Sequence, residues 1–323
     1  MECNSLRASS IQTYQDCQFK YYLYNVAGFE SKTARKALLG TTFHHVQELL
    51  AKAKRNKHYL LQDRFTNITY LADICWAHYN KEFPGLMKPD EDYKTLHKLC
   101  AKAWDSNYNP LKLNIIDIEK QFEIEIIGKG FQGSNGSPVK LRGTIDLITE
   151  NDPETLHIID WKTGKRTAWV GNYLKDEETL KNDIQFQVYD IARRAIYPQY
   201  KYCLFTVIYI SETGPYTFTF NDTDLPASYE NIRRELVSIK NNDNPQRLMD
   251  NSQRKNEFFK CKHVCQFGHK TNLKESDCQK YYKLFMQYED KKLQQIAIDS
   301  TCTKVSRRND YNKAGIFKGS IKT

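Results

Sequence analysis

Three residues in the middle of the chain have the types and spacing for metal-dependent chemistry. Asp146 and Asp160 each lie in an apolar, β-branched run, and a turn signature at 151–154 joins the two runs. This pattern predicts a hairpin with one carboxylate on each strand, which suits a hard divalent cation such as Mg²⁺. Lys162 follows Asp160 by two residues and shares its face of the strand. We therefore expect a metal site with a cationic side chain beside it.

Hydrophobic periodicity predicts the elements that would position this hairpin. Apolar and polar residues alternate over 118–126, as in a half-exposed strand. Helical spacing follows over 183–196, and two more strands are expected at 202–211 and 216–220. The order of helices, three strands, a helix, two strands and helices predicts an α/β fold with a mixed central β-sheet flanked by helices.

The first helix should begin near the N-terminus. Ser9 followed by Gln12 matches a capping box, so Ser9 is the expected N-cap, and Cys17 would lie further along the same helix. The chain has nine cysteines, which we expect to be reduced thiols that act as buried apolar residues or metal ligands. Taken alone, Cys17 fits a core position better than a ligand.

A second helix is expected over about 35–54. His44 and Glu48 are four residues apart there and share a face of the helix. A single histidine on such a helix is more often structural than a ligand. Spacing alone does not separate His44 from His45 as the candidate.

These patterns divide the chain into five parts. The N-terminal helices occupy 1–55, and a helical insertion follows at 56–117, where core packing is the simplest interpretation of the aromatic residues. The strand-rich core covers 118–245, and a cysteine-containing region covers 246–298. A basic tail at 299–323 is interpreted either as an arm that contacts phosphate or as a solvated end.

Composition restricts the class of partner. The 323 residues carry a formal net charge of +9, which favours a polyanionic partner but also fits ordinary solubilising charge. The hydrophobic fraction of 40% is that of a folded globular protein. No apolar run approaches the ~20 residues of a membrane span, and the first residues lack the pattern of a signal peptide. We expect a cytoplasmic protein without a membrane partner.

Five short motifs occur in an order that is typical of one group of nucleases. They are Ser10-Ile11-x-x-Tyr14-x-x-Cys17-x-x-Lys20-Tyr21-Tyr22, Gly40-x-x-x-His44-x-x-x-Glu48, Gly143-Thr-Ile-Asp146, Asp160-Trp-Lys162-Thr-Gly and Gln185-x-x-x-Tyr189. Over about residues 9–280 the chain resembles the RecB-type branch of the PD-(D/E)xK nucleases. That branch includes the nuclease domains of RecB and AddB, the CRISPR adaptation exonucleases and many phage exonucleases. The resemblance implies a restriction-endonuclease-like core.

The resemblance also implies a role for each matching residue. The ligands of Mg²⁺ or Mn²⁺ would be His44, Asp146, Asp160 and the main-chain carbonyl of Trp161. Lys162 would orient the attacking water or neutralise charge on the phosphate, and Gln185 and Tyr189 would hold Lys162 and the substrate backbone. Glu48 would support His44 from one turn away. The match selects His44 over His45.

Many members of this branch bind a [4Fe–4S] cluster through one cysteine of the first helix and three near the C-terminus. The matching residues here are Cys17, Cys261, Cys265 and Cys278. Their C-x3-C-x12-C spacing departs from the usual C-x2-C-x5-C. Structural Zn²⁺, with His263 or His269 as further ligands, and no metal at all are the alternatives.

The expected function is that of a Mg²⁺- or Mn²⁺-dependent DNA exonuclease. It would act on single strands or duplex ends in recombination, repair or replication, with a helicase or another recombination protein as a further partner. The alternatives are an endonuclease or RNA-acting nuclease of the same fold, and a non-catalytic nucleic-acid-binding protein on a nuclease scaffold.

Overall fold

A computed structural model of the chain describes residues 1–57, 63–167, 174–212, 214–248, 261, 265–268, 275–301 and 317–322. The strands are β1 (Ser5–Leu6), β2 (Ile115–Ile127), β3 (Val139–Asp152), β4 (Thr155–Lys162), β5 (Tyr202–Tyr209), β6 (Tyr216–Thr219) and β7 (Phe317–Lys322). They form one seven-stranded sheet in the order β6-β5-β4-β3-β2-β7, with β1 paired to β3. Three pairs are parallel, namely β4 with β5, β2 with β7 and β1 with β3, so the sheet is mixed as predicted.

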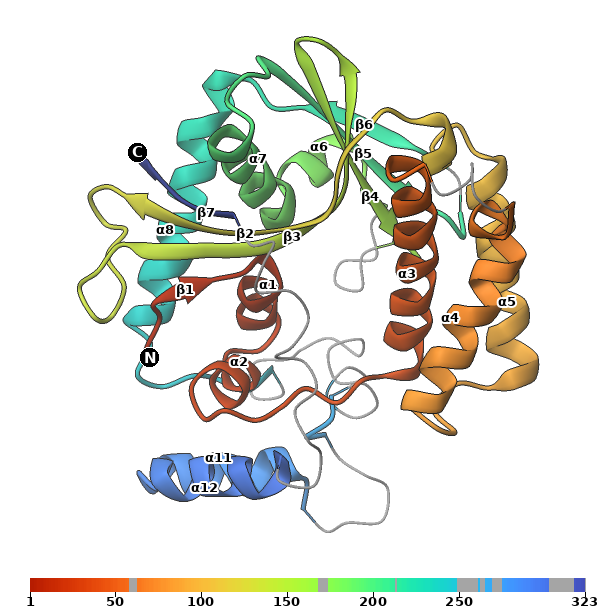
Figure 1. The fold of residues 1–323 in the computed structure, drawn as a ribbon. Coiled ribbons are helices and arrows are strands. Elements are labelled where there is room, and N and C mark those ends of the chain that lie inside the picture. The colour runs from red at the N-terminus through yellow and green to blue at the C-terminus, as the bar shows by residue number, and fades with distance from the viewer. Residues whose placement is uncertain are drawn as a thin grey trace.

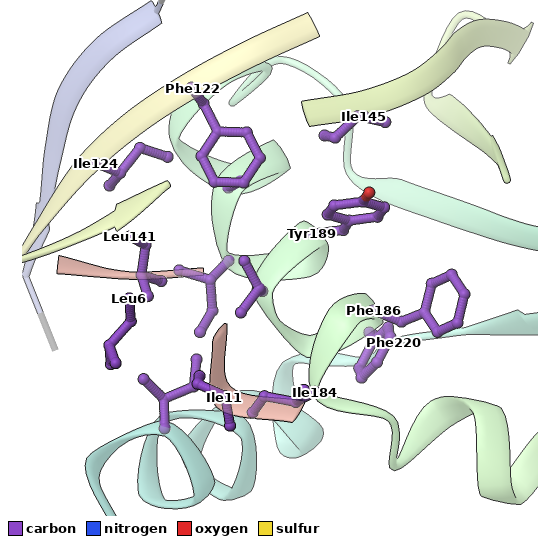
Figure 2. Close-up of a cluster of buried hydrophobic side chains, with 14 of the residues drawn as sticks. Leu6, Ile11, Phe122, Ile124, Leu141, Ile145, Ile184, Phe186, Tyr189 and Phe220 are labelled. Atoms are coloured by element: carbon purple, nitrogen blue, oxygen red, sulfur yellow. The ribbon is translucent and has the colours of Figure 1, made fainter. Parts of the chain in front are cut away.

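One face of the sheet carries α1 (Ala8–Asp16), α7 (Ile184–Ile196) and α8 (Leu225–Lys240) (Figure 1). Figure 2 shows the core between them, where Ile184 and Phe186 of α7 lie beneath Phe122 and Ile124 of β2. Ile184, Val188 and Ile191 repeat at helical spacing and are all buried, so the predicted helix and its buried face are confirmed. The short α6 (Glu177–Lys181) precedes α7.

The other face carries α3 (Arg35–Arg55), with α4 (Ile68–Glu82) and α5 (Pro89–Asp105) packed beyond it (Figure 1). Phe43, Val46 and Leu50 of α3 belong to the same buried cluster as Leu147 and Trp161 of the hairpin. The helical insertion therefore packs its apolar side chains on α3 on the side away from the sheet. Short 3₁₀ turns lie at η2 (Asp63–Thr66) and η3 (Pro110–Lys112), and η4 (Asp222–Asp224) leads into α8.

The prediction for the first helix is wrong in two respects. The N-cap is Arg7, whose backbone N–H donates to Ser10 Oγ at 3.0 Å, and not Ser9. The helix also ends at Asp16, and Cys17 has an extended backbone between α1 and α2 (Gln18–Asn25). Cys17 therefore lies at a junction between two helices and not on a continuous helix.

The C-terminal part also differs from expectation. The cysteine-containing region ends in two helices, α11 (Asp277–Met286) and α12 (Asp290–Thr301), and Tyr288 turns the chain between them with a φ of 58°. Both helices pack on the aromatic residues of α2. Part of the basic tail forms β7, which pairs with β2 at the sheet edge, and residues 302–316 lie outside the described residues. None of the described helices has both the length and the apolar character needed to cross a membrane.

Candidate active site

The predicted hairpin is present, and its two strands separate at the carboxylates. β3 and β4 pair from the turn as far as Leu147 opposite Ile159, and no further pairing follows. Asp146 and Asp160 are the next residues on the two strands, one on each side of this fork. The two predicted acidic residues therefore lie on opposite sides of the point where the sheet opens.

α3 brings His44 to the fork. His44 Nδ1 lies 3.2 Å from Asp146 Oδ2. A Cβ atom at Gly40 would lie only 2.9 Å from Thr163 Oγ1, so glycine permits the close approach of α3 to the end of β4. His45 points elsewhere, with its ring 5.7 Å from that of Tyr79. The structure thus brings His44, and not His45, to the predicted carboxylate.

A third group, Glu119 of β2, was not predicted from the sequence. Its pairing neighbours place it opposite Asp146, and its backbone has a φ of 47°, which is uncommon for a residue other than glycine. Ligand atoms of His44, Glu119 and Asp146 all lie within 4.8 Å of one another. Antiparallel pairing of the two predicted strands could have indicated the position of Glu119, but the backbone turn at this residue has no sequence signature.

On the β4 side of the fork, Lys162 is held by two partners, Asp160 and Gln185. Its Nζ lies 2.7 Å from Asp160 Oδ2 and donates to Gln185 Oε1 at 3.0 Å. The amide of Gln185 in turn donates to Asp160 Oδ1 at 2.8 Å. Asp160, Lys162 and Gln185 therefore fix one another.

Tyr189 acts on the backbone and not on Lys162. Its hydroxyl donates to the main-chain oxygen of Thr144 at 2.6 Å and accepts from Gln185 Nε2 at 3.0 Å. Asp183 caps the start of α7 by accepting from the Gln185 N–H, and it also binds Lys175 at 2.9 Å. These contacts hold α7, and with it Gln185, against the fork.

Burial and crowding of charge shift the ionisable groups of the site. Burial, opposed by Lys162 and reinforced by Asp146, raises the pKa of Asp160 to about 6. Burial, together with Asp146 and Glu48, raises the pKa of Glu119 to about 8. Although burial alone would raise it, the pKa of Asp146 is lowered by the adjacent His44. Without a cation, burial therefore disfavours the charged forms of Asp160 and Glu119.

The donor set fits a divalent cation. Asp146 Oδ2 and Asp160 Oδ2 are buried oxygens without a hydrogen bond, although each lies within ion-pair distance of His44 or Lys162. Buried carboxylate oxygens of this kind are costly unless a cation or a donor satisfies them. Two carboxylates and an imidazole are donors that Mg²⁺ and Mn²⁺ accept. His44, Asp146 and Glu119 would hold the ion, and Asp160 lies outside this three-residue group.

The four predicted cysteine ligands line one largely apolar cavity. Cys17 approaches it from the α1–α2 junction, and Cys261, Cys265 and Cys278 approach from the C-terminal part. A Cβ atom at Gly268 would lie 1.8 Å from the main-chain oxygen of Cys261, so only glycine fits this turn. Within the described residues, no three of these sulfur atoms lie within 4.8 Å of one another. His263 and His269, the alternative zinc ligands, lie outside the described residues.

Comparison with known proteins agrees with this geometry. The sequence matches the PD-(D/E)XK nuclease superfamily over residues 5–269. No curated protein matches the chain. One solved structure found in the comparison is a protein from Eubacterium rectale described as a candidate exonuclease, with 14% sequence identity, a TM-score of 0.45, and coverage of 76% of this chain and 84% of that chain. The match over residues 5–269 shows that this chain belongs to the PD-(D/E)XK nuclease superfamily, and its mixed sheet with flanking helices is a restriction-endonuclease-like core.

Proposed function

We propose that the chain is a divalent-metal-dependent DNA exonuclease that hydrolyses phosphodiester bonds in single strands or at duplex ends. The observation that carries the proposal is the convergence of His44, Glu119 and Asp146 on one point, with Lys162 held at the same fork. The RecB-type motif order supports exonuclease activity, and the net charge of +9 supports a polyanionic substrate. We propose that this activity serves recombination, repair or replication, with a helicase or another recombination protein as a partner.

His44, Glu119 and Asp146 would hold a Mg²⁺ or Mn²⁺ ion, which when bound would supply Lewis-acid chemistry for phosphate and water. The chain supplies the positions of the groups around it. Lys162 presents its ammonium group toward the phosphate, where it stabilises charge that accumulates during hydrolysis. Asp160 and Gln185 keep Lys162 in one orientation, which avoids reorganisation during the reaction. Asp160 and the Trp161 carbonyl are further candidate ligands because they follow the fork on β4.

A metal-titrated cleavage assay on end-labelled substrates tests the proposal. Linear single-stranded DNA, linear duplex DNA, closed circular DNA and RNA of matched sequence are incubated with increasing Mg²⁺ or Mn²⁺. The proposal expects metal-dependent release of short products from linear DNA and no cleavage of circles. Cleavage of circles would support an endonuclease, and preference for RNA would support an RNA-acting enzyme. No cleavage of any substrate at any metal concentration would support a non-catalytic binding protein.

We further propose that Cys17, Cys261, Cys265 and Cys278 bind a [4Fe–4S] cluster. Resemblance to the RecB-type branch supports a cluster, because these residues match its cysteine positions. All four cysteines line one cavity, which supports a shared group. The cluster would join the α1–α2 junction to the C-terminal part of the chain. There, α11 and α12 pack on α2 residues such as Phe19. Structural Zn²⁺ is the alternative.

A further inference from the structure

A buried glutamine lies beside the proposed metal ligands without a hydrogen-bond partner. Gln47 follows His44 by three residues on α3, so the two side chains share a face of the helix. It is only 5% exposed, and neither its amide nitrogen nor its amide oxygen has a partner in the described structure. Buried polar atoms are almost always satisfied in folded proteins, so a group left without a partner marks a site for water or an ion.

A second unpartnered donor faces the same region. The Trp161 indole is 2% exposed, and its Nε1 lacks a hydrogen-bond acceptor among the described residues. Gln47 and Trp161 both line a small cavity together with His44, Glu119 and Asp146. The cavity has room for about one water molecule. Two orphaned polar side chains from different elements therefore meet beside the proposed ligands.

The chemistry of these groups matches a single water molecule. The Trp161 indole can only donate, the Gln47 amide can donate and accept, and a carboxylate such as Glu119 can only accept when ionised. One water can accept from the Trp161 indole and from the Gln47 amide nitrogen and donate to Glu119, which satisfies the two donors that lack a partner. An apolar residue would otherwise suit this position, since Val46, Leu50 and Ala51 around it on α3 are buried apolar residues.

We propose that Gln47 and the Trp161 indole hold an ordered water that orients Glu119 toward the bound divalent cation. Gln47 is then a positioning residue, because it acts on the metal through Glu119. Groups that orient metal ligands in this way typically change metal affinity by about 10- to 100-fold when they are removed. This inference rests on the proposed metal-dependent function.

The test measures Mn²⁺ binding without substrate, by titration calorimetry on the full chain, together with thermal unfolding of the metal-free protein. Gln47→Leu should raise the Mn²⁺ dissociation constant about tenfold. It should leave the unfolding temperature of the metal-free protein unchanged or higher, because leucine has no polar atoms to leave unsatisfied. Gln47→Met, which keeps the length of the side chain, should behave in the same way and serves if the leucine variant folds poorly.

Thr42→Val is the matched control on the same helix. Thr42 is fully buried, but its hydroxyl donates to the Leu38 main-chain oxygen at 2.8 Å, so it plays no part in the cavity. Its Mn²⁺ affinity should equal that of the wild type, while Trp161→Phe should weaken binding as Gln47→Leu does. Wild-type affinity in both Gln47 variants would overturn the inference and leave the metal-dependent function intact. A wild-type protein that binds no Mn²⁺ would overturn both.

Discussion

The hydroxyl of Tyr189 donates to the main-chain oxygen of Thr144 at 2.6 Å. Thr144 pairs with Gln121 of β2 on one side, but β4 has already left β3 on the other, so no strand is available to bind this carbonyl. Tyr189 from α7 takes the place of the missing strand. The fork that separates Asp146 from Asp160 is therefore stabilised by a side chain from the helix that also positions Gln185.

Tyr189→Phe should destabilise the protein and reduce cleavage. The change leaves a buried carbonyl at Thr144 without a donor, which costs about 1–3 kcal/mol, and removes one partner of Gln185. Urea unfolding measures the first effect. Tyr229→Phe is the control, because the buried Tyr229 hydroxyl has no hydrogen-bond partner in the described structure, and its removal should be neutral or stabilising. Equal stability of the two variants would show that the Thr144 contact has no energetic role.

Glu119→Gln should weaken Mn²⁺ binding by at least about tenfold, because an amide oxygen is a poorer ligand for a hard cation than a carboxylate. Glu123→Gln is the matched control on the same strand. Glu123 pairs with Lys140 and Arg142 away from the fork, so its replacement should leave Mn²⁺ affinity unchanged. Unchanged affinity in Glu119→Gln would remove Glu119 from the ligand set.

A [4Fe–4S] cluster bound by the four cysteines would give the purified protein a colour. Anaerobically purified protein should show a broad absorption band near ~400 nm, which zinc cannot produce. Cys278→Ser should abolish the band, while Cys75→Ser should retain it, since Cys75 is buried among the helices beyond α3. A colourless wild-type protein that contains one zinc ion per chain would refute the cluster and support the alternative.

His157 should make the protein less stable in mild acid. Burial lowers the pKa of His157 to about 4 from its ordinary value of 6.5. The unfolded chain binds this proton below pH ~6.5 and the folded protein only near pH ~4, so stability falls as the pH drops through this window, by up to about 3 kcal/mol. Denaturant unfolding at pH 7 and pH 4.5 should show a smaller loss for His157→Gln than for the wild type. Identical losses would mean that other groups dominate the acid response.

Local patterns predicted much of this fold. The hairpin and α7 were predicted because alternation, turn residues and helical spacing are encoded within a few neighbouring residues. The strand β7 was missed because its partner, β2, lies about two hundred residues earlier in the chain, and its sequence has little strand character. The break at Cys17 was also missed, since it depends on packing against the distant C-terminal helices.

The same contrast between locally encoded features and features that depend on distant residues holds for the site. Ordered motifs predicted five site residues, and the structure places them at one fork: His44, Asp146, Asp160, Lys162 and Gln185. Glu119 was not identified, because its approach depends on strand register and on one unusual backbone angle. Gln47 lies within an identified helix, but only three-dimensional packing shows that its amide has no partner.

Lys162 provides the most direct test of the account. The rate of Mg²⁺-dependent nucleotide release from end-labelled linear DNA is compared for the wild type, Lys162→Ala and Lys140→Ala, with circular dichroism to verify folding. Lys140 lies on β3, pairs with Glu123 of β2 and is outside the site, so its variant should cleave at the wild-type rate. Lys162→Ala should be slower by about 10²–10³-fold while it remains folded. Wild-type cleavage by folded Lys162→Ala would contradict the proposed site.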